Sequence, residues 1–173
     1  MRRANRQLLW MLVTVALLAC LVLWTVQRRS ADARPETLLP FAADTVSRID
    51  IKTRKGERRR FEKRDGHWYM LAPQKGRADA GHMQRLSAIA RARILDWRPA
   101  REFDPKKIGL APPWAVVTID GHELKFGTLS ALAPQRYVLV NGHIAMIPAR
   151  YGADIAATAD SELAHAGSTL PKL

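Results

Sequence analysis

The chain has 173 residues, and its 28 lysines and arginines exceed its 16 aspartates and glutamates, which gives a formal net charge of +12. A length of this order allows one domain of ordinary size and little more. The single cysteine, Cys20, excludes a disulfide framework and any zinc site built on several thiolates.

The first element in chain order is an apolar segment, residues 8–26, which contains no charged side chain and is flanked by five arginines. As a helix it would be about 28 Å long, close to the hydrocarbon thickness of a bilayer. Trp10 and Trp24 lie near its two ends, where indole rings favour the membrane interface. These features predict a transmembrane helix that acts as an uncleaved signal anchor.

Two other interpretations of this segment stay open. Residues 30–33 (SADA) resemble an A-x-A cleavage site, but cleaved signal peptides usually have a shorter apolar core of about 7–15 residues. Residues 17–20 (LLAC) would serve as a lipid-attachment box, although the apolar residues continue well beyond Cys20. Basic residues are almost equally numerous on the two sides of the segment, so the positive-inside rule nearly ties; because a short N-terminal tail is easily retained, we expect it in the cytoplasm. The prediction is a single-pass membrane protein with its C-terminal domain on the extracytoplasmic side.

Domain boundaries follow from changes in composition along the chain. A stalk is expected after the anchor, because prolines and charged residues occur there without periodicity. The expected division is a cytoplasmic tail at 1–7, the transmembrane anchor at 8–26, the stalk at 27–43, an extracytoplasmic α+β domain at 44–163 and a flexible tail at 164–173.

Short alternating strands begin after the stalk. Strands are predicted near residues 48–52, 58–63 and 67–71, and Asp65-Gly66 is a strong signal for a two-residue hairpin turn. Together they would form a three-stranded antiparallel meander. A helix is then predicted over residues 80–93 with Asp79 as its N-cap, because apolar residues recur there every three or four positions.

The second half repeats this order of elements. One helical turn is expected at residues 104–109, followed by strands near residues 115–119, 122–126, 137–140 and 144–147. Asp120-Gly121 and Asn141-Gly142 supply two of the turns, and a helix is expected from about residue 152 to 163. The predicted fold class is α+β, with an N-terminal single transmembrane helix followed by a small domain of two antiparallel β-meanders, each with a following helix.

Several turn and packing motifs also carry a family resemblance: residues 65–70 with Pro73, 104–110 followed by Pro112, 124–127, and 136–138. They are similar to a bacterial domain-of-unknown-function family of membrane-anchored envelope proteins, which is also found in auxiliary components of gliding-motility-type ABC transporters. The resemblance covers about residues 46–155 and implies an anchored extracytoplasmic domain, but it supplies no catalytic residues. With the apolar segment, it implies a single-pass protein of the bacterial inner membrane, with the N terminus in the cytoplasm and the C-terminal domain in the periplasm. The short chain with one anchor departs from the transporter-associated members.

Signals for catalysis or metal binding are weak. His67, His122 and His143 each follow the glycine of a predicted turn, so they would bind a metal only if those turns converged; polar residues also suit such positions for structural reasons alone. No nucleophile elbow and no phosphate-binding glycine loop occurs. We predict no catalytic residue, no metal and no cofactor, hence no enzyme. The alternative is an enzyme that acts on an envelope polymer or lipid through a site assembled from distant residues.

The densest charge lies between residues 48 and 64, where nine lysines and arginines face three acidic residues. A solvated hairpin would explain this run, and nucleic acid is disfavoured because aromatic residues are not regularly interleaved. Trp68, Tyr69, Trp97 and Trp114 would line a groove or, more commonly, build the core. The candidate contacts with anionic lipid or a partner are Arg54, Lys55, Arg58, Arg59, Arg60 and Lys63.

These observations predict a non-catalytic interaction or accessory module of an envelope complex, with a transporter association as one form of it. Its expected partners are the membrane, into which it inserts, and an envelope protein, with no nucleic acid.

Overall fold

The structure is a computed structural model that describes Leu18 and residues 35–163. The chain divides into two units, Met1–Arg34 and Pro35–Leu173, and the fold below is that of the second. The predicted anchor at 8–26 lies outside the described residues except for Leu18, and so do the two predicted terminal tails. Among the residues that are described, no helix is both long enough and apolar enough to cross a membrane.

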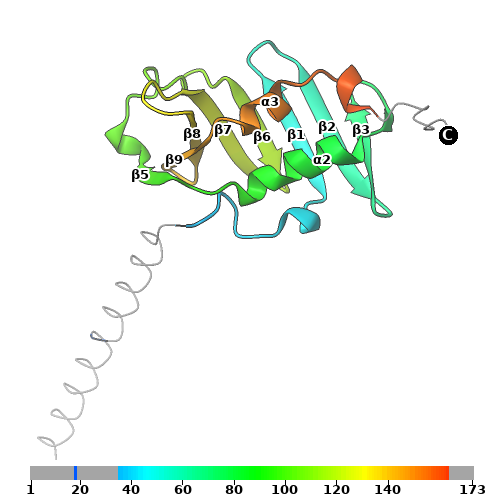
Figure 1. The fold of residues 1–173 in the computed structure, drawn as a ribbon, viewed down its shortest axis with the longest axis horizontal. Helices are drawn as coiled ribbons and strands as arrows, with labels where there is room; N and C mark the ends of the chain where they lie inside the picture. Colours follow the sequence, from blue (N-terminus) through cyan, green and yellow to red (C-terminus); the bar gives the residue numbers. More distant parts are fainter. Residues whose placement is uncertain (1–17, 19–34, 164–173) are drawn as a thin grey trace, which may run out of the picture. The chain divides into compact units, whose positions relative to one another are not determined.

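The strands of the described part form one sheet of nine, in the order β4-β3-β2-β1-β6-β7-β8-β9-β5 (Figure 1). Every neighbouring pair is antiparallel. The strands are β1 Arg48–Thr53, β2 Arg58–Arg64, β3 His67–Ala72, β4 Gly76–Arg77, β5 Asp96–Pro99, β6 Ala115–Ile119, β7 His122–Leu129, β8 Gln135–Val140 and β9 His143–Pro148.

Helices cover one face of this sheet, where α2 and α3 lie (Figure 1). The α2 helix is capped as predicted, since the Asp79 carboxylate accepts a hydrogen bond from the backbone N–H of His82 at 2.7 Å. The helical segments are α2 Ala80–Ser87, α3 Tyr151–Ala156, and the 3-10 turns η1 Ala43–Thr45, η2 Ala88–Arg91, η3 Ala100–Glu102 and η4 Asp160–Glu162. The predicted helix at 80–93 therefore changes to 3-10 geometry after Ser87.

The predicted fold class, with two separate β-meanders that are each followed by a helix, is wrong. The two expected meanders are one sheet, because β1 pairs with β6 and places Ile49 opposite Ile119 and Ile51 opposite Val117. The helix expected at 152–163 is a short α-helix followed by a 3-10 turn. Each meander alone would leave a long edge of unpaired backbone groups beside an apolar face. Pairing those two edges satisfies the hydrogen bonds and joins the two apolar faces.

The three predicted two-residue turns are confirmed. Asp65, Asp120 and Asn141 have φ of 50°, 45° and 48°, and the glycine after each also has positive φ. A tight hairpin turn of this kind needs positive φ at both central residues, which Asp or Asn followed by Gly tolerates best. Local sequence thus determines these hairpins.

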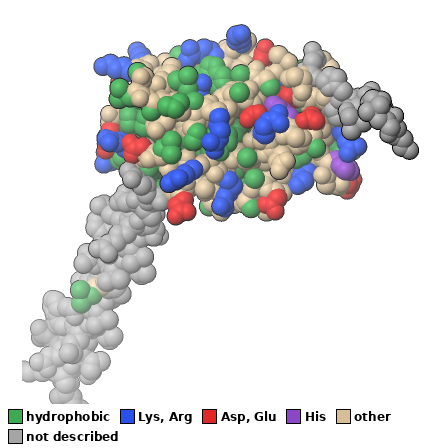
Figure 2. All heavy atoms as spheres, viewed as in Figure 1, with side chains coloured by type: hydrophobic (Ala, Val, Ile, Leu, Met, Phe, Trp, Pro, Cys, Tyr) green, Lys and Arg blue, Asp and Glu red, His purple; other side chains and the backbone are tan. Residues whose placement is uncertain are grey.

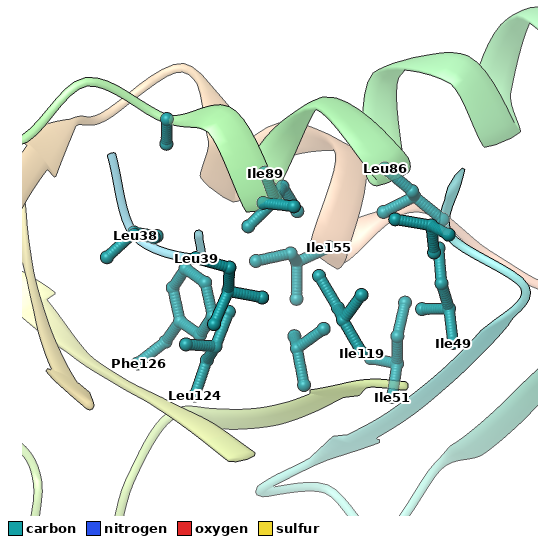
Figure 3. Close-up of a cluster of buried hydrophobic side chains, with 14 of the residues drawn as sticks. Leu38, Leu39, Ile49, Ile51, Leu86, Ile89, Ile119, Leu124, Phe126 and Ile155 are labelled. Carbon is teal, nitrogen blue, oxygen red and sulfur yellow. The ribbon is translucent and has the colours of Figure 1, made fainter. Parts of the chain in front are cut away.

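A hydrophobic core fills the space between the sheet and its helices (Figure 3). Leu86 of α2, Ile89 of η2 and Ile155 of α3 face side chains of the sheet. Leu38 and Leu39, from the segment expected to be a stalk, are buried in the same core. Their backbone N–H groups donate to the carbonyls of Ala92 and Ala90. The folded unit therefore includes this apolar pair, which lies before the expected start at residue 44.

On the opposite face a smaller cluster covers part of the sheet, where Ile108 and Leu110 pack with Ile144. The expected helical turn at 104–109 is a series of hydrogen-bonded turns, and Gly109 has a left-handed conformation with φ of 67°. This segment lies so close to β7 that a Cβ on Gly127 would be 2.3 Å from the Ile108 carbonyl oxygen. The close approach requires glycine at this position of the strand.

Candidate partner-binding site

The three consecutive arginines of β2 alternate between the two faces of the sheet. The side chains of Arg58 and Arg60 are 60% and 42% exposed, whereas that of Arg59 is 2% exposed. Arg59 stands opposite Ile51 on the core face, and Arg60 stands opposite Asp50 on the other face. The six predicted contact residues therefore do not form one continuous surface.

Most of these six residues interact within the domain. Arg58 and Arg60 both pair with Asp50, at 3.2 and 3.1 Å. The Lys63 ammonium donates to the Asp44 carbonyl at 3.0 Å. Arg54 donates to the backbone carbonyls of two consecutive prolines, 112 and 113.

Lys55 differs from the other five, because it has no hydrogen bond or ion pair with any described residue. It lies in the turn between β1 and β2 and is exposed. Its ammonium is therefore the most available cation of the set.

The buried arginine belongs to a charged cluster that the sequence did not reveal. Arg59 forms an ion pair with Glu162 and also donates to the Ile155 carbonyl. His82 Nε2 lies 2.9 Å from the same Glu162 oxygen, and both side chains are buried. Because a buried charge is tolerated only with partners, the cluster fastens the segment after α3 to β2 and α2. The sequence feature that could have indicated this burial is the alternation of side chains along a strand. It places the middle one of three consecutive arginines on the face opposite to its two neighbours.

Two adjoining hollows lie at the turn between β1 and β2. The first, of about 500 Å³, lies among Gly56, Arg58, Arg59, Pro73 and Ala159. The second, of about 310 Å³, lies among Thr53, Arg54, Lys55, Trp114 and Ala156. Glu57 and Thr158 line both, so the two hollows adjoin at these residues. We call them together the hairpin groove.

Two residues that line the groove each have a buried polar atom without a hydrogen-bond partner among the described residues: Arg59 Nε and Thr53 Oγ1. Such atoms are uncommon in folded proteins because an unmade hydrogen bond in a buried place is unfavourable.

Trp114, which lines the groove, packs against the guanidinium of Arg136. The guanidinium carbon of Arg136 lies 4.2 Å from the Trp114 ring centroid, and the same group donates to the Gly127 carbonyl at 2.7 Å. Partial burial lowers the pKa of the Arg136 guanidinium. Arg136 thus contacts both Trp114 and Gly127, although the three residues are far apart in sequence.

The three turn histidines lie at the same end of the sheet but not together. Three strands separate β3, which begins at His67, from β7, which begins at His122. His122 packs against Phe41, with 5.4 Å between ring centroids, and His143 stacks on Trp97 at 4.8 Å. Within the described residues, no group of three or more His, Cys, Asp and Glu side chains is placed to hold a metal ion.

The aromatic residues divide between core and groove. Trp68, Trp97 and Trp114 pack against the main core, as their strand spacing favoured. Tyr69 pairs in register with Glu62, on the opposite face. Trp114 alone of these four also lines the groove.

The comparisons with known proteins give one match. The family described as Domain of unknown function (DUF4340) matches residues 17–113, more than half of the chain. The match includes the β1–β2 turn and Pro73, whereas Trp114 and the segment after α3 lie beyond it. No curated protein and no solved structure matches the chain.

Proposed function

We propose that this chain, which belongs to the DUF4340 family of domains of unknown function, is a non-catalytic interaction module that binds an envelope protein through the hairpin groove. It acts as an accessory part of an envelope complex, of which a transporter complex is one form. Residues 8–26 hold it at the bacterial inner membrane, with the N terminus in the cytoplasm and the domain in the periplasm.

The cationic rim of the hairpin groove is the observation that carries this proposal. Arg54 and Lys55 lie at that rim, and neither pairs with a carboxylate among the described residues. Positive charge of this kind attracts acidic partners and increases the rate of encounter. Trp114 adds a large apolar surface of the type that contributes most to binding energy in protein interfaces.

The location rests on the sequence alone. Residues 8–26 are long enough to span a bilayer, carry no charge, and have arginines on both sides. A membrane location restricts the partners to proteins of the same compartment.

Photo-crosslinking of the full chain in cell membranes tests the interaction. A benzoylphenylalanine placed at Lys55 is expected to form an adduct with one protein, whose crosslinked peptide, identified by mass spectrometry, is acidic. The same probe at Asn141, exposed in a turn at the opposite end of the sheet, is the matched control. Equal adducts at both positions, adducts with lipid alone, or an adduct that persists after Arg54→Glu would contradict the proposal.

A reporter fusion tests the location. Alkaline phosphatase fused after Leu173 folds to an active enzyme only in the periplasm, so we expect activity in intact cells. A stable but inactive fusion would place the domain in the cytoplasm.

A further inference from the structure

We propose that the loop between β7 and β8, residues 129–134, inserts its apolar side chains into the interface of a bilayer that contains anionic phospholipid. This inference goes beyond the hairpin groove and rests on the membrane location proposed above. It is carried by a group of exposed leucines at one end of the sheet, by the lack of charge in the loop and by cations beside it.

Exposed leucines gather where β7 ends. In the part of the folded unit that the structure describes, three large apolar side chains are exposed: Leu95, Leu129 and Leu132, by 43%, 52% and 98%. Leu129 is the last residue of β7, Leu132 lies in the loop, and Leu95 directly precedes β5. Scattered exposed leucines need no explanation, whereas a group of them at one place indicates a contact surface.

The strand register places these leucines at one end of the sheet. Leu129, Arg136 and Ile147 lie opposite one another on β7, β8 and β9. Beside them, the Leu95 N–H donates to the Met146 carbonyl at 2.8 Å, where β5 begins. Three strand spacings, about 14 Å in all, separate β7 from β5. The leucines are therefore close enough to meet the same patch of membrane surface.

The loop keeps Leu132 exposed through its own hydrogen bonds. The Leu132 N–H donates to Ser130 Oγ at 3.3 Å, and the Ser130 N–H donates to the Gln135 carbonyl at 2.8 Å. The Ala149 N–H donates to the Pro134 carbonyl at 2.9 Å, which fixes the loop to the segment after β9. Because the loop is already ordered, little conformational freedom is lost when its apolar side chains become buried.

The composition of the loop favours lipid over protein as its partner. Residues 126–135 (FGTLSALAPQ) contain no charged side chain, so the loop enters an apolar layer without the cost of removing a charge from water. Protein interfaces usually involve about 20–30 residues on each side, and their strongest contacts are tryptophan, tyrosine and arginine. A short tip of leucine, alanine and proline is too small for such an interface, whereas a bilayer accepts it without a complementary shape.

Cations beside the loop account for the anionic phospholipid. Arg150 directly follows the residue that is hydrogen-bonded to the loop; it is exposed, and its guanidinium carbon lies 5.0 Å from the Tyr151 ring centroid. Among the described residues, Arg150 forms no ion pair. Arg93 is also exposed but lies beside Glu36, and Asp96 is already paired with an arginine. Arg150 is thus the cation best placed to meet a phospholipid phosphate, and arginine and tyrosine together suit the membrane interface.

Quenching of fluorescence by nitroxide lipids tests the insertion. The full chain is reconstituted into vesicles of phosphatidylcholine and phosphatidylglycerol, some of which carry a nitroxide on the acyl chain. A fluorophore is attached at Leu132→Cys in a Cys20→Ala background, and we expect the nitroxide to quench it. The same label at Asn141→Cys, in an exposed turn at the opposite end of the sheet, is expected to stay unquenched. Equal quenching at the two positions, or none at Leu132, would overturn the inference.

Variants of the exposed leucines separate insertion from folding. With the label at Ala131→Cys, replacing Leu129 and Leu132 by Ser is expected to lower the ratio of quenched to unquenched label at least about tenfold, because the burial of two leucines in lipid is lost. The melting temperature should not fall, since both side chains are exposed in the domain. Unchanged quenching in this variant would show that the leucines do not hold the loop in the bilayer, and the inference would be wrong.

Arg150→Gln tests the contact with the headgroup. In vesicles with phosphatidylglycerol it should lower the same ratio about fivefold, the size expected for one basic residue near an anionic surface. In vesicles of phosphatidylcholine alone it should have much less effect. Arg64→Gln is the matched control, because Arg64 is 58% exposed but lies at the other end of the sheet, and salt limits such attraction to about 10 Å. Equal effects of the two variants would show only a general charge effect and would contradict the role of Arg150.

The native Cys20 separates this inference from the proposed location. A label on Cys20 of the otherwise unchanged chain reports whether residues 8–26 enter the bilayer. Quenching at Cys20 without quenching at Leu132→Cys would support the location and refute the inference, and the opposite result would refute the location and support the inference. A label at Leu132→Cys that is shielded in cell membranes but unquenched in pure lipid would show that a protein covers the loop, which would also overturn the inference.

Discussion

Arg58 and Arg59 are neighbours on β2, yet they lie in opposite environments. The Arg58 side chain is 60% exposed and pairs with Asp50 on the open face, whereas that of Arg59 is 2% exposed and pairs with Glu162 on the helix-covered face. An exposed ion pair contributes little to stability, but a buried charge that loses its partner is strongly destabilising. A run of like charges in a sequence therefore cannot be assigned one role when it lies on a strand.

The buried ion pair between Arg59 and Glu162 also stabilises the wall of the groove. Glu162 follows the segment that contributes Ala156, Thr158 and Ala159 to the groove wall, and its ion pair with Arg59 holds this segment on the sheet. Figure 2 shows that Lys and Arg side chains are spread over the visible face, with Asp and Glu among them. What distinguishes the rim is thus that Arg54 and Lys55 have no carboxylate partner among the described residues and lie beside a hollow.

The largest expected effect comes from breaking the buried pair. Arg59→Met leaves the buried Glu162 without its arginine, and should lower the free energy of unfolding by about 3–5 kcal/mol. Arg58→Ala, the exposed counterpart, should lower it by less than about 1 kcal/mol. Urea unfolding of the full chain in detergent, followed by tryptophan fluorescence, measures both. Equal losses would show that burial does not distinguish the two arginines.

A double variant sharpens the same comparison. Replacing both Arg59 and Glu162 by Met removes the buried charges together, so it should destabilise the fold less than Arg59→Met alone. A double variant less stable than the single one would contradict this account.

A smaller effect is expected on the face covered by residues 104–110. Gly127→Ala places a Cβ 2.3 Å from a backbone oxygen that cannot move alone, and should lower the free energy of unfolding by about 1–3 kcal/mol. At Gly152 the Cβ would meet the end of the Arg136 side chain at 3.1 Å, so Gly152→Ala should cost less because that side chain can shift. Thermal denaturation of both variants ranks them, and the reverse order would contradict the prediction.

The smallest effect is expected at an exposed pair. The hydrogen bond from Arg64 lowers the pKa of Glu62 below its ordinary value. A lowered folded-state pKa contributes stability above the ordinary value, and that contribution is lost as the pH falls through the folded value. The melting temperature of Glu62→Gln should therefore lie slightly below that of the parent at neutral pH and converge with it in acid. A gap that widens on acidification would contradict this sign.

Local features of the fold were predictable because neighbouring residues determine them. The turns at 65–66, 120–121 and 141–142 and the Asp79 cap depend on backbone conformations that few residue types tolerate. The candidate site was predicted only in part. Its Arg54, Lys55 and Trp114 were named from sequence, but Thr53 and the wall at 156–159 were not, because no local signal marks residues that meet across the fold.

The sequence by itself determined the hairpins, the start of α2, and an apolar segment at 8–26 of membrane-spanning length. The tertiary structure decided that β1 pairs with β6 to give one sheet, and that Leu38 and Leu39 belong to its core. It also decided that Arg59 is buried with Glu162 while its neighbours remain exposed. The physical reason is that turns and caps depend on adjacent residues, whereas strand pairing and charge burial depend on which distant apolar faces and partners meet.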